Sequence, residues 1–107
     1  MIEKKVSEAI EQAVCYELQN IVKKYGATYA STHEAYAVLK EEVEEAQECL
    51  SYMLLHLGEI WKGVKDNNIA NIDIEQCKQS AIALAEEAVQ CAAVCERFAE
   101  TITGGVK

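Results

Sequence analysis

Proline is absent from this chain, and only five glycines interrupt its 107 residues. Ala, Glu, Leu, Gln and Lys are abundant, and all of them favour helices, so the composition predicts long uninterrupted helices. Half of the residues are apolar, which is enough for one compact core but not for two. We therefore expect an all-α fold organised as a single domain over residues 1–107.

A first helix is predicted over residues 2–24, because apolar residues recur there at intervals of three and four. These residues are Ile2, Val6, Ile10, Ala13, Val14, Leu18, Ile21 and Tyr25. Gly26 can adopt the left-handed conformation that ends a helix. Lys23 and Lys24 lie favourably near the negative end of the helix dipole.

The second helix is predicted to begin at Ser31, which forms a capping box with Glu34. Its apolar seam includes Leu39, Val43, Leu50, Met53, Leu57, Ile60 and Val64, and it ends at the polar residues 65–68. Gly58 and Gly63 are the points where this long helix is most easily bent or ended.

A third helix is expected from about residue 74 to Ile102, after a second capping box formed by Asp73 and Gln76. Gly104 and Gly105 close it. Its apolar arc is so wide that it needs partners on more than one side, and three helices alone make a thin core. The prediction is a three-helix chain with long antiparallel helices whose bundle is completed by homo-oligomerisation, as a dimer with a tetramer as the alternative.

The formal net charge of −8 argues against binding to nucleic acid or to an anionic membrane surface. A nucleotide would need metal ions as intermediaries. The N-terminal residues contain no apolar signal core, and no apolar run approaches the length that spans a bilayer. A cytoplasmic location is expected.

The five cysteines, Cys15, Cys49, Cys77, Cys91 and Cys95, are an odd and scattered set, which argues against a disulfide framework. Cys91 and Cys95 stand one helical turn apart, and with His33 or His56 they have the ligand types of a zinc site. The spacing is not that of the usual zinc motifs. We favour free, buried structural cysteines over metal ligands.

Four carboxylates of the second helix lie close together in the sequence, at Glu41, Glu42, Glu44 and Glu45. At about 100° per residue, Glu42 lies about 60° and Glu45 about 120° to one side of Leu39, whereas Glu41 and Glu44 face away from the seam. Two half-buried carboxylates one turn apart need a cation, and Mg²⁺ prefers such oxygen ligands. The alternative is a solvated acidic face, which is common on Glu-rich helices.

The third helix offers Glu87 as a further ligand, at the margin of its apolar arc. In an antiparallel hairpin, Glu45 meets Glu87 only if the turn is centred near residue 66. The connection between residues 65 and 72 is centred slightly later, which offsets the pair by about one to two helical turns. A bend at Gly58 or Gly63, an asymmetric loop, or a site shared between protomers would restore the match.

Residues 24–26, 33–45 and 86–93 resemble the MazG-like proteins, a family of all-α nucleoside triphosphate pyrophosphohydrolases with a four-helix-bundle core. The likeness is to its short, single-domain members, including those of phages and mobile elements, and it covers nearly the whole chain. The family binds Mg²⁺ through an EExxE motif on one helix and an ExxD motif on the next. It hydrolyses a nucleoside triphosphate to the monophosphate and pyrophosphate.

EExxE is present here as Glu41, Glu42 and Glu45, whereas ExxD is degenerate, with Glu87 in place and Gln90 where the aspartate belongs. The resemblance implies Glu42, Glu45, Glu87 and Gln90 as ligands of Mg²⁺ or Mn²⁺. It also implies Glu41 or Glu45 as the catalytic group that orients the attacking water. Because Gln90 removes one negative charge from the site, the alternative is a catalytically silent binding or oligomerisation protein of the same fold.

Contacts with a nucleobase are expected from Tyr29, Tyr36 or Trp61, although an aromatic on a helical stripe is more often part of the core. Lys40, Lys62 and Arg97 are candidates for contact with phosphate, against the alternative that each is an ordinary solvated cation.

Overall fold

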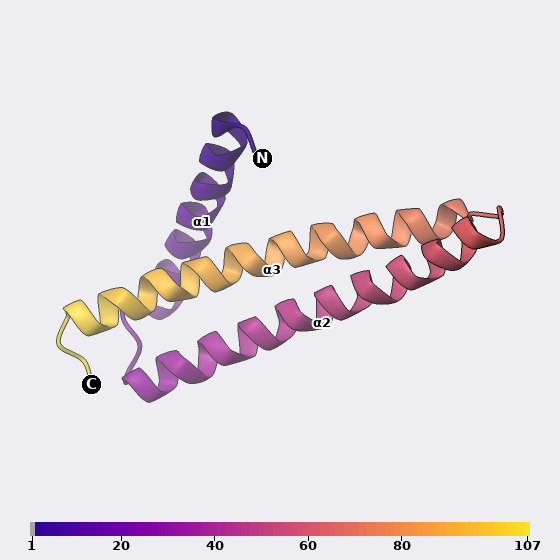
Figure 1. Cartoon of the computed structure of the whole chain (residues 1–107). Helices are drawn as coiled ribbons and strands as arrows, with labels where there is room; N and C mark the ends of the chain where they lie inside the picture. Colours follow the sequence, from indigo (N-terminus) through magenta and orange to yellow (C-terminus); the bar gives the residue numbers. More distant parts are fainter. Residues whose placement is uncertain (1) are drawn as a thin grey trace. The chain divides into compact units, whose positions relative to one another are not determined.

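The structure of the protein is a computed structural model that describes residues 2–107 (Figure 1). It contains three helices, α1 (Lys4–Tyr25), α2 (Thr32–Lys65) and α3 (Asn71–Thr103), and no strand occurs in the described part. The predicted all-α fold with three helices is therefore confirmed. Over the same residues, none of the helices combines the length and the apolar character needed to cross a membrane.

The boundary between α1 and α2 follows the capping signals of the sequence. Gly26 has a φ of 93°, in the left-handed region, and its N–H donates to the carbonyl oxygen of Val22 at 2.8 Å. The hydroxyl of Ser31 accepts a hydrogen bond from the backbone N–H of Glu34 at 3.1 Å. Ser31 therefore satisfies one of the N–H groups that the first turn of α2 leaves without a helical partner.

The expected start of the third helix near residue 74 is wrong by three residues, because α3 begins at Asn71. Asp73 lies within its first turn, where a carboxylate is favourable for the helix dipole, and the N–H of Asp73 donates to the carbonyl of Ala70. The capping pattern of Asp73 and Gln76 thus marks the first turn and not the residue before the helix.

The turn between α2 and α3 is tight. The N–H of Asn68 donates to the carbonyl of Gly63 at 2.8 Å, and Asn67 has a φ of 53°. A Cβ on Gly63 would lie 2.9 Å from the Cα of Ile69, so the chain passes too close for a side chain there. Gly58 has open space around it, and α2 continues through both glycines without interruption.

Contacts along the chain group the residues into two compact units. The first unit contains residues 2–43 and 88–107, and therefore α1, the start of α2 and the end of α3. Its small core consists of Tyr29, Ala35 and Val94, with Val38 and other partly buried apolar side chains packed against it. The second unit, residues 44–87, is the hairpin formed by the rest of α2 and α3, which run antiparallel.

Arg97 holds the connection between α1 and α2 in the first unit. Its side chain is only 6% exposed, and its guanidinium donates to the carbonyl oxygens of Tyr25, Gly26 and Thr28, each at 3.1 Å. The guanidinium also lies 4.0 Å from the centre of the Tyr29 ring. The expectation of a solvated or phosphate-binding cation is therefore wrong, since all of these partners belong to the protein itself.

Thr101 completes this connection one turn further along α3. Its hydroxyl oxygen accepts a hydrogen bond from the N–H of Tyr29 at 2.9 Å, and the hydroxyl donates to the carbonyl of Arg97 at 2.8 Å. Thr101 is fully buried, as expected for a polar group whose donor and acceptor are both satisfied.

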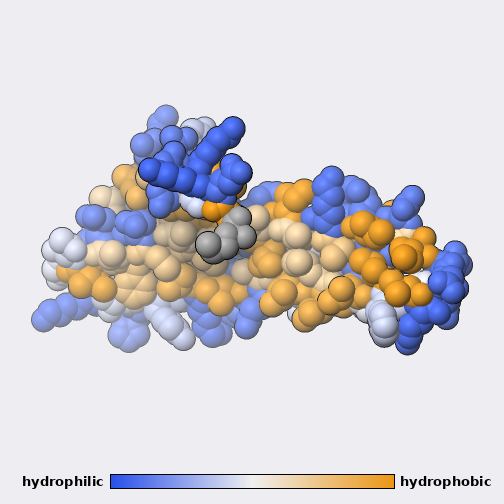
Figure 2. Space-filling model, turned by 45° about the horizontal axis from the view of Figure 1, so that its top comes forward, coloured by the Kyte–Doolittle hydropathy of each residue, from blue (hydrophilic) through white to orange (hydrophobic). Residues whose placement is uncertain are grey.

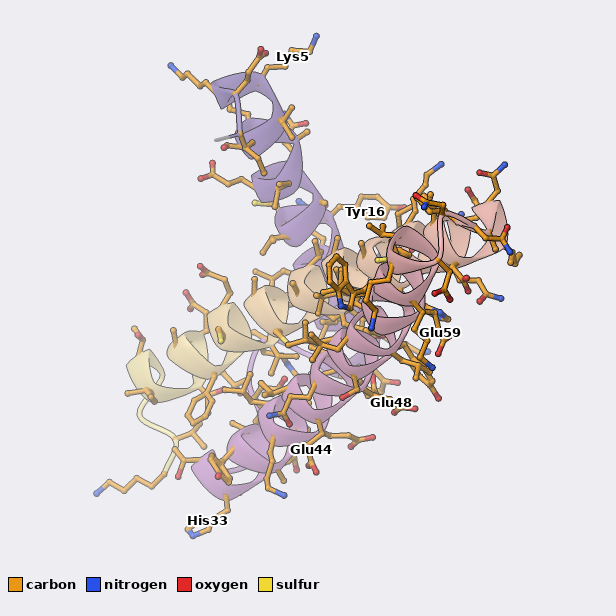
Figure 3. The ribbon with its side chains drawn as sticks, turned by 45° about the vertical axis from the view of Figure 1, so that its right-hand side comes forward. Lys5, Tyr16, His33, Glu44, Glu48 and Glu59 are labelled. Carbon is orange, nitrogen blue, oxygen red and sulfur yellow. The ribbon has the colours of Figure 1, made fainter. Side chains whose placement is uncertain are left out.

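The second unit buries none of its side chains completely. Glu44, Glu48 and Glu59 of α2 project away from the hairpin (Figure 3). The residues of α2 that are partly buried recur at intervals of three and four, which identifies the side of the helix that meets α3. They are Ala46, Cys49, Met53, His56, Ile60 and Gly63.

Candidate metal centre

Glu42 and Glu45 lie one turn apart on α2, which is continuous from Thr32 to Lys65. Their spacing of three residues places the two side chains on neighbouring positions of one helical surface. Glu42 is partly buried, and one of its carboxylate oxygens, Oε2, has no contact with solvent. Glu45 is exposed.

Glu45 of α2 and Glu87 of α3 face each other within the hairpin of residues 44–87. One carboxylate oxygen of Glu45 lies within 4.8 Å of one carboxylate oxygen of Glu87. The predicted offset of one to two helical turns between Glu45 and Glu87 along the hairpin is therefore absent. Both residues belong to one chain, so the pair needs no second protomer.

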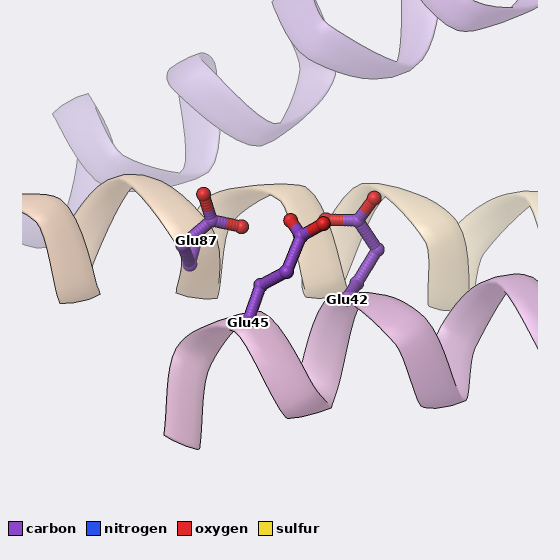
Figure 4. A group of neighbouring side chains, drawn as sticks. All are labelled: Glu42, Glu45 and Glu87. Atoms are coloured by element: carbon purple, nitrogen blue, oxygen red, sulfur yellow. The ribbon is translucent and has the colours of Figure 1, made fainter. Parts of the chain in front are cut away.

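One carboxylate oxygen from each of Glu42, Glu45 and Glu87 lies within 4.8 Å of the other two (Figure 4). A cation at the centre of such a triangle would lie about 2.8 Å or less from each oxygen, and Mg²⁺–oxygen bonds are about 2.0–2.1 Å long. Small rotations of these long side chains would close that difference. The three residues therefore fit a divalent cation that keeps the rest of its coordination shell for water or phosphate.

The electrostatics of the group agree with this fit. The hydrogen bond to Glu87 raises the pKa of Glu45 above its ordinary value, and the negative charge of Glu87 and partial desolvation raise it further. Partial burial also raises the pKa of the Cys49 thiol, together with the charges of Glu87, Glu48 and Glu45. Both shifts have the direction that a concentration of negative charge produces, and a bound cation would relieve it.

Glu87 provides a further sign that the group lacks a positive partner. Its Oε2 atom is buried and accepts no hydrogen bond from the described residues. A buried carboxylate oxygen without a donor is costly, since the oxygen has lost its water. A metal ion would supply what this oxygen lacks.

A cavity of about 760 Å³ lies in the first unit and includes Glu42 in its wall. Its apolar and aromatic lining comes from Ile21, Tyr25, Tyr29, Ala30, Val38 and Val94, and its polar lining from Glu17, Thr28, Glu34, Glu42, Gln90 and Arg97. The volume lies within the range of small-molecule sites, about 300–1,000 Å³. Gln90, the degenerate position of the second motif, therefore shares a cavity with Glu42.

The remaining predicted site residues lie outside the group of three carboxylates. Glu41 is exposed and is not part of the three-carboxylate group. Tyr36 and Trp61 are largely exposed on the surface of α2, whereas Tyr29 is buried beneath the guanidinium of Arg97. Lys62 pairs with Glu59 at 3.2 Å.

The expected burial of the cysteines is wrong. None of the five forms a disulfide, but Cys15 and Cys95 are exposed and the other three are only partly buried. Within residues 2–107, the three carboxylates are the one cluster of His, Cys, Asp or Glu side chains with metal-site spacing, so Cys91 and Cys95 are not joined by a histidine.

The part of the site that sequence reasoning missed is the cavity and the role of Arg97. The only signal was a lone cation at a position where α3 is otherwise strongly apolar. Local periodicity could not reveal this role, since the residues that supply the three carbonyl partners of Arg97 are about 70 residues away in the sequence. Comparisons of the chain with protein-family models, with curated proteins and with solved structures gave no match.

Proposed function

We propose that the protein is a Mg²⁺- or Mn²⁺-dependent nucleoside triphosphate pyrophosphohydrolase of the MazG-like type, acting in the cytoplasm as a homo-oligomer. The observation that carries the proposal is the approach of Glu42, Glu45 and Glu87 to within 4.8 Å of one another. Three carboxylates that share a small volume are suited to a divalent cation, and such a cation makes a triphosphate acceptable to a chain with a net charge of −8.

In this proposal, Glu42, Glu45 and Glu87 hold the metal. A bound Mg²⁺ would neutralise charge on the triphosphate and lower the pKa of a coordinated water. Glu45 is the exposed member of the group, and it is suited to accept a hydrogen bond from the attacking water and to orient it. Glu41, one turn before Glu45 and exposed, is the second candidate for this positioning role.

The cavity that includes Glu42 is suited to the nucleoside part of the substrate. It combines the ring of Tyr25 and aliphatic side chains with the carboxylates of Glu17 and Glu34. Carboxylates accept hydrogen bonds, so a base or sugar that presents N–H or O–H donors would be favoured there. Arg97 already donates to three carbonyl groups, so it is not assigned to the phosphates.

The experiment has two readouts, Mn²⁺ binding measured by calorimetry and pyrophosphate release from a panel of nucleoside triphosphates. Glu87→Gln keeps the size of the side chain and removes one ligand charge, so we expect at least about a tenfold weaker Mn²⁺ affinity and loss of turnover. Glu42→Gln should behave in the same way. The matched control is Glu86→Gln, the same substitution at an exposed neighbour outside the group, which should leave both readouts unchanged.

The second candidate is a catalytically silent member of the same fold that binds a partner or a ligand. Gln90 favours it, because a neutral amide stands where the resembled family has a metal-binding aspartate. Metal binding that depends on Glu87, without turnover of any nucleotide, would select this candidate. If the missing charge is the cause, Gln90→Asp should tighten Mn²⁺ binding or restore pyrophosphate release. Absence of Mn²⁺ binding in the wild type would reject the metal centre itself.

A further inference from the structure

Each of the three helices lines the cavity of the first unit with one stripe of side chains. Within each stripe the residues are spaced by three or four positions, so they lie on one side of their helix. The lining residues of α1, α2 and α3 are, in this order, Glu17, Ile21 and Tyr25; Glu34, Val38 and Glu42; and Gln90, Val94 and Arg97. All of them belong to residues 2–43 and 88–107, so the cavity is a feature of the first unit alone.

The polar side chains of this cavity mostly accept hydrogen bonds. Glu17, Glu34 and Glu42 carry carboxylates, which accept and do not donate. Arg97 is the cation of the lining, but its guanidinium already donates to three backbone carbonyls. The amide of Gln90 offers a donor beside an acceptor. A complementary ligand therefore brings N–H donors to the carboxylates and an acceptor to Gln90.

Glu17 is the carboxylate of this set that is best placed to recognise a base. Glu42 is assigned to the metal, and Glu34 is exposed, so water competes for its hydrogen bonds. Glu17 is partly buried, and neither a hydrogen bond nor an ion pair joins its carboxylate to another of the described residues. A donor from a ligand would satisfy this carboxylate where water is partly excluded.

Guanine has the base edge that matches such a carboxylate. It presents N1–H and N2–H side by side, and a carboxylate accepts two parallel N–H bonds with its two oxygens. Adenine and cytosine present one N–H donor group beside a ring nitrogen that accepts. Uracil and thymine present one N–H between two carbonyl oxygens. Each of these four bases would place an acceptor against the second carboxylate oxygen, which disfavours it.

We infer that the protein selects guanine nucleotides, with the carboxylate of Glu17 accepting from N1–H and N2–H of the base and the amide of Gln90 donating to its O6. The inference rests on the proposed use of this cavity by the nucleoside part of the substrate. Ile21, Val38 and Val94 supply apolar surface for the flat faces of the base. Gln90 then serves recognition of the base, at the position where the resembled family has a metal-binding aspartate.

The test is binding of free nucleosides to the full chain in EDTA, measured by chemical-shift titration. Neither phosphate nor metal takes part, so the result does not depend on turnover. Inosine is guanosine without the 2-amino group, and it keeps N1–H and O6 but loses one of the two adjacent donors. We expect the wild type to bind guanosine about tenfold or more tightly than inosine, because a bidentate contact discriminates by about that factor.

Glu17→Gln keeps the size of the side chain and replaces one acceptor by a donor. The variant should bind guanosine and inosine about equally and should gain affinity for adenosine, whose edge has a donor beside an acceptor. The matched control is Glu11→Gln on the same helix, which should keep the wild-type affinities. Residues 4–13 of α1 are all exposed, and Figure 2 shows mostly hydrophilic residues over this part of the helix, at the top of the view.

Several results would overturn the inference. They are equal binding of guanosine and inosine to the wild type, no binding of guanosine at about 1 mM, and a guanosine preference that Glu17→Gln leaves intact. Binding of methylguanidinium as tight as that of guanosine would also overturn it, because charge alone would then explain the attraction. The comparison of guanosine with inosine uses the wild type, so it stands even if the variant fails to fold.

The pyrophosphate assay separates this inference from the proposed reaction. Selective binding of guanosine in EDTA, without pyrophosphate release from any triphosphate, would support the guanine site and reject the hydrolase. Pyrophosphate release with the same kcat/KM for GTP and for inosine triphosphate would support the hydrolase and reject the guanine site.

Discussion

Replacing Arg97 by methionine should destabilise the protein by about 3 kcal/mol. Methionine preserves most of the apolar stem but removes three hydrogen bonds, to the carbonyls of Tyr25, Gly26 and Thr28. A hydrogen bond from a charged donor contributes about 1.5–3 kcal/mol, so the gross loss is about 4.5–9 kcal/mol. Loss of the cation–π contact with Tyr29 adds about 0.5–2 kcal/mol.

Two effects offset part of this loss. The three hydrogen bonds share one guanidinium, so their contributions are not additive and their sum overstates the loss. The carbonyls of Tyr25 and Gly26 belong to exposed residues, so water can reach them in place of Arg97. The net change of about 3 kcal/mol is the difference between these larger quantities. It corresponds to a fall in Tm of about 12–24 °C for a chain of this length.

The assay is urea unfolding followed by circular dichroism at one fixed protein concentration. Lys65→Met is the control, since it also removes a cation that lies over an aromatic ring, 5.7 Å from the centre of Trp61, but on an exposed surface. It should change the free energy of unfolding by less than about 0.5 kcal/mol. If Arg97→Met costs less than about 1 kcal/mol, the three carbonyl contacts do not hold the connection between α1 and α2, and the reasoning is wrong.

Gly63→Ala should lower the midpoint of urea unfolding, because the added Cβ would lie 2.9 Å from the Cα of Ile69. Gly58 has open space around it, so Gly58→Ala should raise the free energy of unfolding by about 0.5–1 kcal/mol. Equal effects at the two glycines would contradict this account of the turn. The raised pKa of Glu45 predicts a pH dependence. Since the folded state binds the proton of Glu45 more tightly than the unfolded state, this contribution to stability is complete below the ordinary pKa of 4.5 and is lost as the pH rises through the higher pKa of the folded state. Glu45→Gln should remove this pH-dependent component from urea midpoints measured in EDTA across that range, and an unchanged profile would contradict the influence of Glu87 on Glu45.

Much of the helical architecture could be predicted from signals within a few residues of each helix boundary. The left-handed glycine at position 26 and the Ser31 cap act within a few residues, so their effects are visible in the sequence. The start of α3 was misplaced because Asp73 suits the first turn of a helix as well as the position before it. The same local rules placed Glu42 and Glu45 on one side of α2.

The tertiary structure decided which distant groups meet. The pairing of Glu45 with Glu87 depends on the register of the hairpin, which the close passage at Gly63 helps to set, and a count of residues from the turn centre predicted an offset instead. Arg97 shows the same limit, since its partners are about 70 residues away and no local pattern distinguishes a buried arginine from a solvated one. The sequence by itself determined the helices and the sides on which their acids lie, because hydrogen bonds and side-chain periodicity within a helix are local. Which acids share a site, and which cation is buried, followed only from packing between helices, because packing joins groups that the sequence separates.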